Sequence, residues 1–299
     1  MKKSSLWKGY LCSIFSAVIY GCMPLLAKLI YADGVNAITL VLFRNLMALP
    51  LIGILAFRQG RSFSIPKKAL PQISLIALAG CCITPLLLLQ SYNYIDSGLA
   101  TIFHFIYPAV VVVISVLFLK QPLQWKILLC VGLCIVGICL CYTPDSPPDW
   151  RGSILAITSG IACAIYICLL AGFSHKQIPF FLFTFYVILI SSILLLAFCL
   201  LTGSLCLPKT PTGWLLCIVF ANLITGGAVV LLQLGTFLLG GERSSILSAL
   251  EPVVSILVGL LFLQERISAE GAIGSVLVIL SSILIAVLDL KANKKGVSV

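Results

Sequence analysis

The chain has 299 residues, of which 61% are hydrophobic and only 9% are charged, whereas an ordinary soluble domain is about a quarter charged. So much apolar surface cannot be buried in a soluble core, and the composition therefore predicts an all-α, polytopic membrane protein. The net charge of +10 does not indicate nucleic-acid binding, because the basic residues stand at the ends of apolar runs and are not interleaved with aromatic residues.

Ten apolar runs are long enough to cross a bilayer, which requires about 20 largely apolar residues. Short connections with turn-forming residues separate them, and no connection has room for a soluble domain. We therefore expect one membrane domain, a bundle of ten transmembrane helices. The predicted spans cover residues 8–30, 35–57, 70–92, 97–119, 125–143, 151–173, 179–202, 213–238, 243–263 and 269–289.

The lysine and arginine residues predict how the bundle is oriented. With the N-terminus in the cytoplasm, fourteen of them fall on the cytoplasmic side and three, Arg151, Lys209 and Arg266, fall outside. Connections on the cytoplasmic side are the ones that carry the excess of basic residues. We therefore expect a multi-pass protein of the cytoplasmic (inner) membrane with both termini in the cytoplasm.

The chain divides into two similar halves near residues 144–148. The sequence Trp7-Lys8-Gly9 before the first span resembles Trp150-Arg151-Gly152 before the sixth. Each half has five spans, and because five is odd the second half enters the membrane from the opposite side. We therefore predict two inverted five-helix repeats, residues 1–143 and 150–299, that together form one membrane domain.

A proline near the middle of the fourth and ninth spans supports this alignment. Placing Pro108 on Pro252 brings Tyr107 onto Glu251, so that each run has its most polar side chain just before the proline. Proline removes a backbone hydrogen bond and bends a helix, and the freed carbonyl needs neighbouring protein or water. Such interrupted helices at matching positions point to a transport site between the repeats.

The third and eighth spans are also interrupted at similar depth, by Thr84-Pro85 and Gly226-Gly227. Two interpretations remain open for these breaks. They either kink the helix and let backbones approach closely, or they line a cavity.

Polar side chains inside the spans are the candidates for substrate binding, because such groups are costly at bilayer depth and face the bundle interior or water. Aromatic residues would supply apolar walls and a few polar groups would fix the orientation of a ligand. The candidate substrate-binding residues are Tyr20, Tyr92, His104, Tyr107, Tyr166, Asn222, Gln233 and Ser248.

Three ionisable residues within the spans have more than one interpretation. His104 shares a helical stripe with Thr101 and Tyr107, which favours a lined cavity, but a hydrogen bond to a neighbouring helix would explain it equally well. Glu251 is the candidate coupling residue that would carry a proton, or it is a structural carboxylate paired with a basic residue. Arg44 is interpreted as a charge that serves topology or packing.

Enzyme signatures are absent from the sequence. It contains no H-E-x-x-H, no G-x-S-x-G and no Walker A motif, and its two histidines and few acids within the spans cannot assemble a triad or a metal site. The thirteen cysteines lie mostly inside apolar runs, where cysteine behaves as a small hydrophobe. We expect no enzyme activity, no cofactor and no metal.

Taken in order, these features resemble the drug/metabolite transporter superfamily, specifically the EamA-type permeases. The resemblance covers nearly the whole chain and depends on the two five-span halves, Phe43-Arg44, Tyr107-Pro108, Glu251-Pro252 and the stretch Leu263–Ser268 with the glycine-rich span after it. It implies a basket-shaped bundle with a central cavity that moves small metabolites, often amino acids, frequently outward. The family commonly has an acid after the fourth span where this chain has Gln121, so a symmetric pair of acids ending both repeats is not available.

The sequence therefore predicts a secondary transporter, an exporter of small organic metabolites such as amino acids, that works by alternating access through a central cavity. Its partners would be a small-molecule substrate and the lipid bilayer, with proton coupling through Glu251 and no nucleic acid. The alternative is a non-transporting membrane scaffold or assembly protein, which needs no polar cavity.

Overall fold

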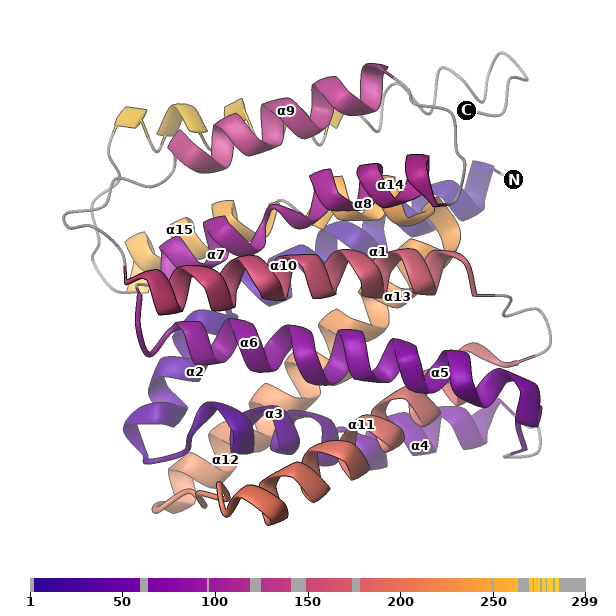
Figure 1. Ribbon diagram of the computed structural model, residues 1–299, viewed down its shortest axis with the longest axis vertical. Helices are drawn as coiled ribbons and strands as arrows, with labels where there is room; N and C mark the ends of the chain where they lie inside the picture. Colours follow the sequence, from indigo (N-terminus) through magenta and orange to yellow (C-terminus); the bar gives the residue numbers. More distant parts are fainter. Residues whose placement is uncertain are drawn as a thin grey trace.

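The structure, a computed structural model, describes residues 3–59, 64–95, 97–118, 125–140, 149–173, 178–248 and 250–262, with short pieces between 269 and 284. All regular secondary structure in these residues is helical, and the helices lie side by side across the bundle (Figure 1). This confirms the predicted all-α class for the described part of the chain.

Within the described residues, seven helices are long and apolar enough to cross a membrane. They correspond to seven of the ten predicted spans. The other three predicted spans, 125–143, 243–263 and 269–289, extend outside the described residues, so the count of ten stays a prediction. The seven helices are Leu6–Ala32, Ala37–Arg58, Lys67–Ser91, Ala100–Leu117, Trp150–Ala171, Phe180–Thr202 and Pro211–Leu239.

Several of these spans consist of shorter helical segments. The segments of the first half are α1 (Lys3–Gly21), α2 (Met23–Ala32), α3 (Ala37–Leu46), α4 (Leu49–Arg58), η1 (Lys67–Ala69), α5 (Leu70–Ile76), η2 (Ala77–Ile83), α6 (Thr84–Ser91), α7 (Ser97–His104), α8 (Tyr107–Leu117) and α9 (Trp125–Leu140). The segments of the second half are α10 (Trp150–Ala171), α11 (Phe180–Thr202), α12 (Pro211–Phe220), η4 (Ala221–Val229), α13 (Val230–Leu239), α14 (Gly241–Ser248) and α15 (Leu250–Phe262).

Proline explains where three of the segments begin. Pro24, Pro50 and Pro108 each occupy the first or second position of a helix, namely α2, α4 and α8. A proline is tolerated there because the backbone N–H that it lacks would have no partner within the helix in any case. The interruption predicted at Pro108 is therefore a real break between segments, and Pro24 and Pro50 mark two further breaks.

The third and eighth spans are interrupted by π-helices at matching positions. These are η2, which begins at Ala77, and η4, which begins at Ala221. The alignment that places Pro108 on Pro252 also places Ala77 on Ala221. π-helical turns are rare and occur frequently at functional sites, so both repeats carry the same unusual feature at the same place.

The two halves exchange their first helices. α1, the start of the first half, packs against α13 and α15 of the second half, whereas α10, the start of the second half, packs against α6, α7 and α8 of the first. Likewise α3 contacts η4 while α11 contacts η2. Each contact thus has a counterpart with the roles of the halves reversed.

Two glycines make this reciprocal packing close. A Cβ atom at Gly9 of α1 would lie 2.7 Å from the Cγ of Leu239, and one at Gly152 of α10 would lie 2.8 Å from the Cγ2 of Ile95. Both distances are shorter than real side-chain contacts, so a larger residue at either crossing would force its neighbour to shift. The two matching tripeptides at the starts of the halves therefore make equivalent contacts.

A connection at one end of the bundle joins the halves through hydrogen bonds. The Asp33 carboxylate accepts hydrogen bonds from the backbone N–H groups of Lys209 and Thr210, at 2.9 and 3.2 Å. The Asn36 side chain accepts from Thr39 N–H, which caps α3, and donates to the Ser204 carbonyl at 2.6 Å. These bonds fix the turn after the first span to the loop before α12, with the Asp33 charge at the positive end of that helix.

Candidate functional site

A cluster of polar side chains surrounds Tyr20, where α1, α3, η2, α10 and α15 meet. Arg44, Cys81, Cys163 and Glu251 all lie within electrostatic range of the Tyr20 hydroxyl. They come from different helices and from both halves of the chain, so only the folded bundle brings them together.

Two further tyrosines extend this cluster. Tyr92, at the end of α6, lies near Thr101 and Glu251. Tyr166 of α10 lies near Tyr20, and its ring packs against Gly80 in η2 so closely that a Cβ atom at Gly80 would overlap it. The lack of a side chain at Gly80 therefore makes room for the Tyr166 ring.

Gln233 of α13 completes the group from the second half. Its Oε1 accepts a hydrogen bond of 2.6 Å from the Thr184 hydroxyl of α11. The side-chain amide of Gln233 also lies close to the hydroxyl of Tyr166. We call Tyr20, Arg44, Tyr92, Tyr166, Gln233 and Glu251 the central polar cluster.

Four polar atoms of the central polar cluster are buried without a well-formed hydrogen bond in the described part of the chain, although the Tyr166 hydroxyl lies close to Gln233 and the Tyr92 hydroxyl lies close to Thr101. The four atoms are the Nε of Arg44, the hydroxyl oxygens of Tyr92 and Tyr166, and the Nε2 of Gln233. A buried polar group without a partner costs about 1–3 kcal/mol, and such groups are uncommon in native structures. A cluster that contains four of them is suited to bind a polar molecule.

The central polar cluster also contains two buried residues of opposite charge. Arg44 is 2% exposed and Glu251 is 8% exposed, yet no ion pair between them is found within the described residues. The alignment of the repeats gives neither charge a counterpart, because Arg44 matches Ile188 and Glu251 matches Tyr107. The two halves share a fold but differ in the charge that they contribute.

Arg44 is a functional candidate that the sequence pattern alone did not place among the binding residues. A single cation within an apolar run is commonly a topological charge, which favoured that interpretation. The signal that was available is its position well inside the second predicted span, residues 35–57, away from both ends. The structure buries its side chain beside Tyr20 and η2.

His104 and Tyr107 lie at the break between α7 and α8. The Nδ1 of His104 is 2.7 Å from the hydroxyl of Ser159 in α10, and that hydroxyl donates its single hydrogen to the Ala156 carbonyl. His104 Nδ1 is then the donor to Ser159, and the ring bridges two helices. This is the hydrogen bond to a neighbouring helix that the sequence left open as an alternative. Tyr107 is buried, with its ring centroid 5.3 Å from that of His104.

The remaining two predicted binding residues make hydrogen bonds to the backbone of the preceding turn. Ser248 donates a hydrogen bond of 3.0 Å to the Ser244 carbonyl within α14. Asn222 donates to the Ile218 carbonyl at 2.9 Å and lies beside Gly226, which faces Leu51 of α4. The structure therefore brings together Tyr20, Tyr92, Tyr166, Gln233 and Glu251, whereas the hydrogen bonds of Asn222 and Ser248 go to their own helices.

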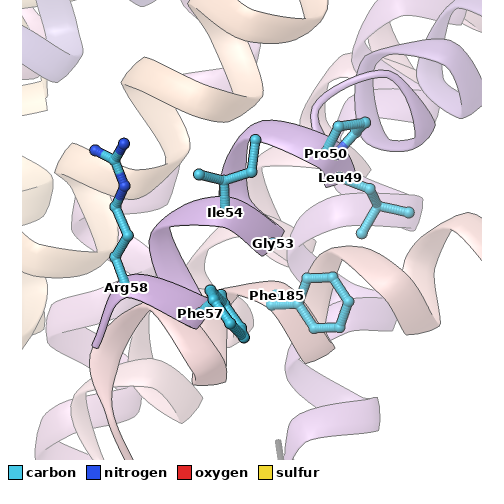
Figure 2. A pocket seen from close by; sticks show the side chains of 7 residues that line it. All are labelled: Leu49, Pro50, Gly53, Ile54, Phe57, Arg58 and Phe185. Atoms are coloured by element: carbon cyan, nitrogen blue, oxygen red, sulfur yellow. The ribbon is translucent and has the colours of Figure 1, made fainter. Parts of the chain in front are cut away.

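A pocket of about 710 Å³ lies elsewhere, between α4 and α11 (Figure 2). Leu49, Pro50, Gly53, Ile54, Phe57, Arg58 and Phe185 line it. It is almost entirely apolar and open to the outside, and Phe57 is 72% exposed. These properties suit contact with lipid chains, so this pocket is not the polar cavity that the sequence predicted.

The comparison with protein families decides the class of this chain. The model of the EamA-like transporter family matches residues 7–143 and again residues 150–287. The chain belongs to the EamA-like transporter family. It is accordingly a multi-pass membrane protein of a transporter family, built from two repeats, and the family resemblance seen in the sequence is confirmed.

Individual relatives of this EamA-like chain agree with that assignment. An uncharacterized transporter of Archaeoglobus fulgidus is 27% identical over 278 residues, which are 91% of this chain and 94% of the relative. The uncharacterized inner membrane transporter YicL of Salmonella typhimurium is 25% identical over 303 residues, 97% of this chain and 98% of the relative. One solved crystal structure overlays on 95% of this chain and 98% of its own with a TM-score of 0.78. At 14% identity this last likeness supports the fold alone.

Proposed function

We propose that this EamA-like protein is a secondary transporter that exports small organic metabolites, such as amino acids, across the cytoplasmic membrane. Ten helices in two inverted five-helix repeats would enclose the site, with both termini in the cytoplasm. The observation that carries the proposal is the central polar cluster, whose buried, unpartnered atoms come from helices of both halves.

The reciprocal packing of the halves supports alternating access as the mechanism. Because α1 packs on the second half and α10 on the first, each half contains an element of the other. Rocking of one half against the other would then open the cluster to one side of the membrane at a time. The matching π-helices η2 and η4 contact α10 and α1, so each half has the same unusual helical turn beside this interface.

Transport by purified protein in liposomes tests this proposal. Preloaded amino acids should leave protein-containing liposomes faster than empty controls. Tyr166→Phe and Gln233→Leu should slow this transport because each removes a polar atom of the central polar cluster, whereas Tyr94→Phe, at an exposed position, should leave it unchanged. Equal rates in protein-containing and empty liposomes for every amino acid, amine and nucleoside tried would favour the alternative of a membrane scaffold.

Glu251 is the candidate for coupling transport to protons, since it is a buried acid that is not paired with Arg44. Glu251→Gln should abolish transport driven by a pH gradient while sparing exchange of substrate for substrate. Glu242→Gln, a change at the partly buried acid in α14, serves as the matched control. If the pH dependence of transport survives in Glu251→Gln, Glu251 is not the coupling residue.

A further inference from the structure

We propose that Arg44 is the anion-recognition residue of the central polar cluster and that it binds a carboxylate group of the transported solute. The proposal rests on the transport function proposed above and adds to it the chemical class of the substrate. It also assigns a binding role to a residue that the sequence pattern alone assigns to topology or packing.

The neighbours of Arg44 hold its backbone in place. On one side, the ring of Phe43 stacks on Trp214 of α12, with centroids 5.6 Å apart. On the other side, the Asn45 side chain donates a hydrogen bond of 3.0 Å to the Cys81 carbonyl in η2. Arg44 lies between these two attachments, and its charge acts on Tyr20 and Cys81. Its position is thus fixed by both halves of the bundle.

Arg44 is buried, and one of its donor atoms lacks a partner within the described residues. Its Nε has no hydrogen-bond acceptor within the described chain, and only 2% of the residue is exposed. An unpaired buried charge costs several kcal/mol, and charged groups within membrane spans mark substrate or ion pathways. The acid in the cluster, Glu251, acts on Tyr20 with the opposite sign and does not pair with Arg44.

Packing does not explain a cation at this position. The corresponding residue of the second repeat is Ile188 in the register of Pro108 and Pro252, or Val187 in the register of Gly9 and Gly152, and both are fully buried. The same place in the same fold is therefore filled by an aliphatic side chain. The arginine serves a chemical purpose that the second repeat does not share.

The chemistry of the guanidinium group indicates which anion it binds. Its planar array of N–H donors matches the two oxygens of a carboxylate and binds them in pairs. The Tyr20 hydroxyl near it and the buried hydroxyls of Tyr92 and Tyr166, which form no well-formed hydrogen bond within the described residues, supply neutral donors. A solute with one carboxylate near Arg44 fits this arrangement, whereas a second carboxylate reaching past Tyr20 would approach the acid Glu251.

Binding of matched acids and amides to the purified full-length protein tests the proposal. The probes are L-leucine against L-leucinamide and phenylacetate against phenylacetamide, with ligand-dependent thermal stabilisation as the measurement. We expect the acids to raise the unfolding temperature of the wild type and the amides to leave it unchanged. Equal stabilisation by an acid and its amide, stabilisation by no acid, or equal stabilisation by inorganic phosphate would overturn the assignment.

Variants of Arg44 test whether this residue causes the preference for acids over amides. Arg44→Gln should abolish the preference for acids, and Arg44→Lys, which keeps the charge but loses the planar pair of donors, should weaken acid binding about tenfold. Arg58→Gln, a change at the exposed arginine that ends α4, should bind as the wild type does. A preference for acids that persists in Arg44→Gln would overturn the proposal.

Two further measurements distinguish carboxylate binding from a purely structural role of Arg44. If Arg44→Gln does not fold but Arg44→Gln with Glu251→Gln does, the two residues form a structural pair and the proposal is wrong. The second measurement is the rate at which phenylglyoxal modifies Arg44 in the wild type, followed by mass spectrometry. Phenylacetate should slow this modification and phenylacetamide should not. Equal rates with both compounds would contradict the proposal.

Transport measurements separate the failure of this proposal from the failure of the transport function. Transport of a carboxylate-containing solute at equal rates by wild type and Arg44→Gln would refute carboxylate recognition while leaving the transport function standing. Acid-specific binding that depends on Arg44, without any transport, would refute only the transport function.

Discussion

The hydrogen bond between Thr184 and Gln233 offers a test of how the central polar cluster is positioned. Thr184 is fully buried, and its hydroxyl donates to Gln233 Oε1 at 2.6 Å. Thr184→Val replaces this hydroxyl with a methyl group of similar shape. Gln233 would then lose the partner at one end while its Nε2 already lacks one in the described chain.

The expected loss of stability follows from two magnitudes. A hydrogen bond between membrane helices contributes about 0.6 kcal/mol on average and at most about 1.7 kcal/mol. A buried acceptor left without a partner costs about 1–3 kcal/mol. We therefore expect Thr184→Val to lower the free energy of unfolding by about 1–2 kcal/mol, as measured by titration with sodium dodecyl sulfate in mixed micelles and followed by tryptophan fluorescence.

The same helix provides the control. Thr202 is exposed at the end of α11 and donates to the Phe198 carbonyl of its own helix, so Thr202→Val should change the stability by less than about 0.5 kcal/mol. Thr184→Ser, which keeps the hydroxyl, should restore substrate affinity that Thr184→Val loses. If Thr184→Val is as stable as the wild type and transports with the same KM, the reasoning about this bond is refuted.

Three other outcomes can be checked. Ser159→Ala should lower stability by about 1 kcal/mol, because it leaves the Nδ1 of His104 buried without its partner; unchanged unfolding in the detergent titration would argue against the helix-bridging role. Gly21→Ala should cost about 1–3 kcal/mol by overpacking, because its Cβ would lie 2.6 Å from the Cβ of Val254 in α15; wild-type stability of this variant would show that α1 and α15 are less close. Desolvation alone would raise the pKa of Asp33, but hydrogen bonds from the N-terminal end of α12 and the charge of Lys209 outweigh it and lower the pKa. The stabilising effect of the Asp33 carboxylate is therefore complete above its unfolded pKa of about 3.9 and is lost as the pH falls through the lower folded pKa. The unfolding temperatures of wild type and Asp33→Asn should accordingly differ at pH 7 and converge in acid. A difference that is constant with pH would contradict this.

The sequence predicted the membrane spans well because the property that makes a span, a long apolar run, is local. The seven spans found in the described residues match predicted ranges within a few residues, and Pro108 interrupts the fourth span as expected. The packing of α1 on the second half depends on contacts between distant residues. No local pattern specifies those contacts.

The site was predicted less completely, for a physical reason. The rule that polar side chains within spans face the interior selects residues but does not say which of them meet. Tyr20, Tyr166 and Gln233 do meet, whereas Asn222 bonds to its own helix. Arg44 was left out of the candidate binding residues because a topological cation and a buried cation look the same in a sequence. Only the fold shows that the side chain of Arg44 is buried.

The wide helical turns η2 and η4 have a practical consequence for anyone who maps this molecule. Each adds one residue to a turn, so the side chains after Ile83 and Val229 are rotated by about 100° relative to an uninterrupted α-helix. A helical wheel drawn through either span in one piece assigns those later residues to the wrong sector. Cysteine-scanning profiles across both spans should show a jump in phase there, and cross-linking distances are best calculated separately for the residues before and after it.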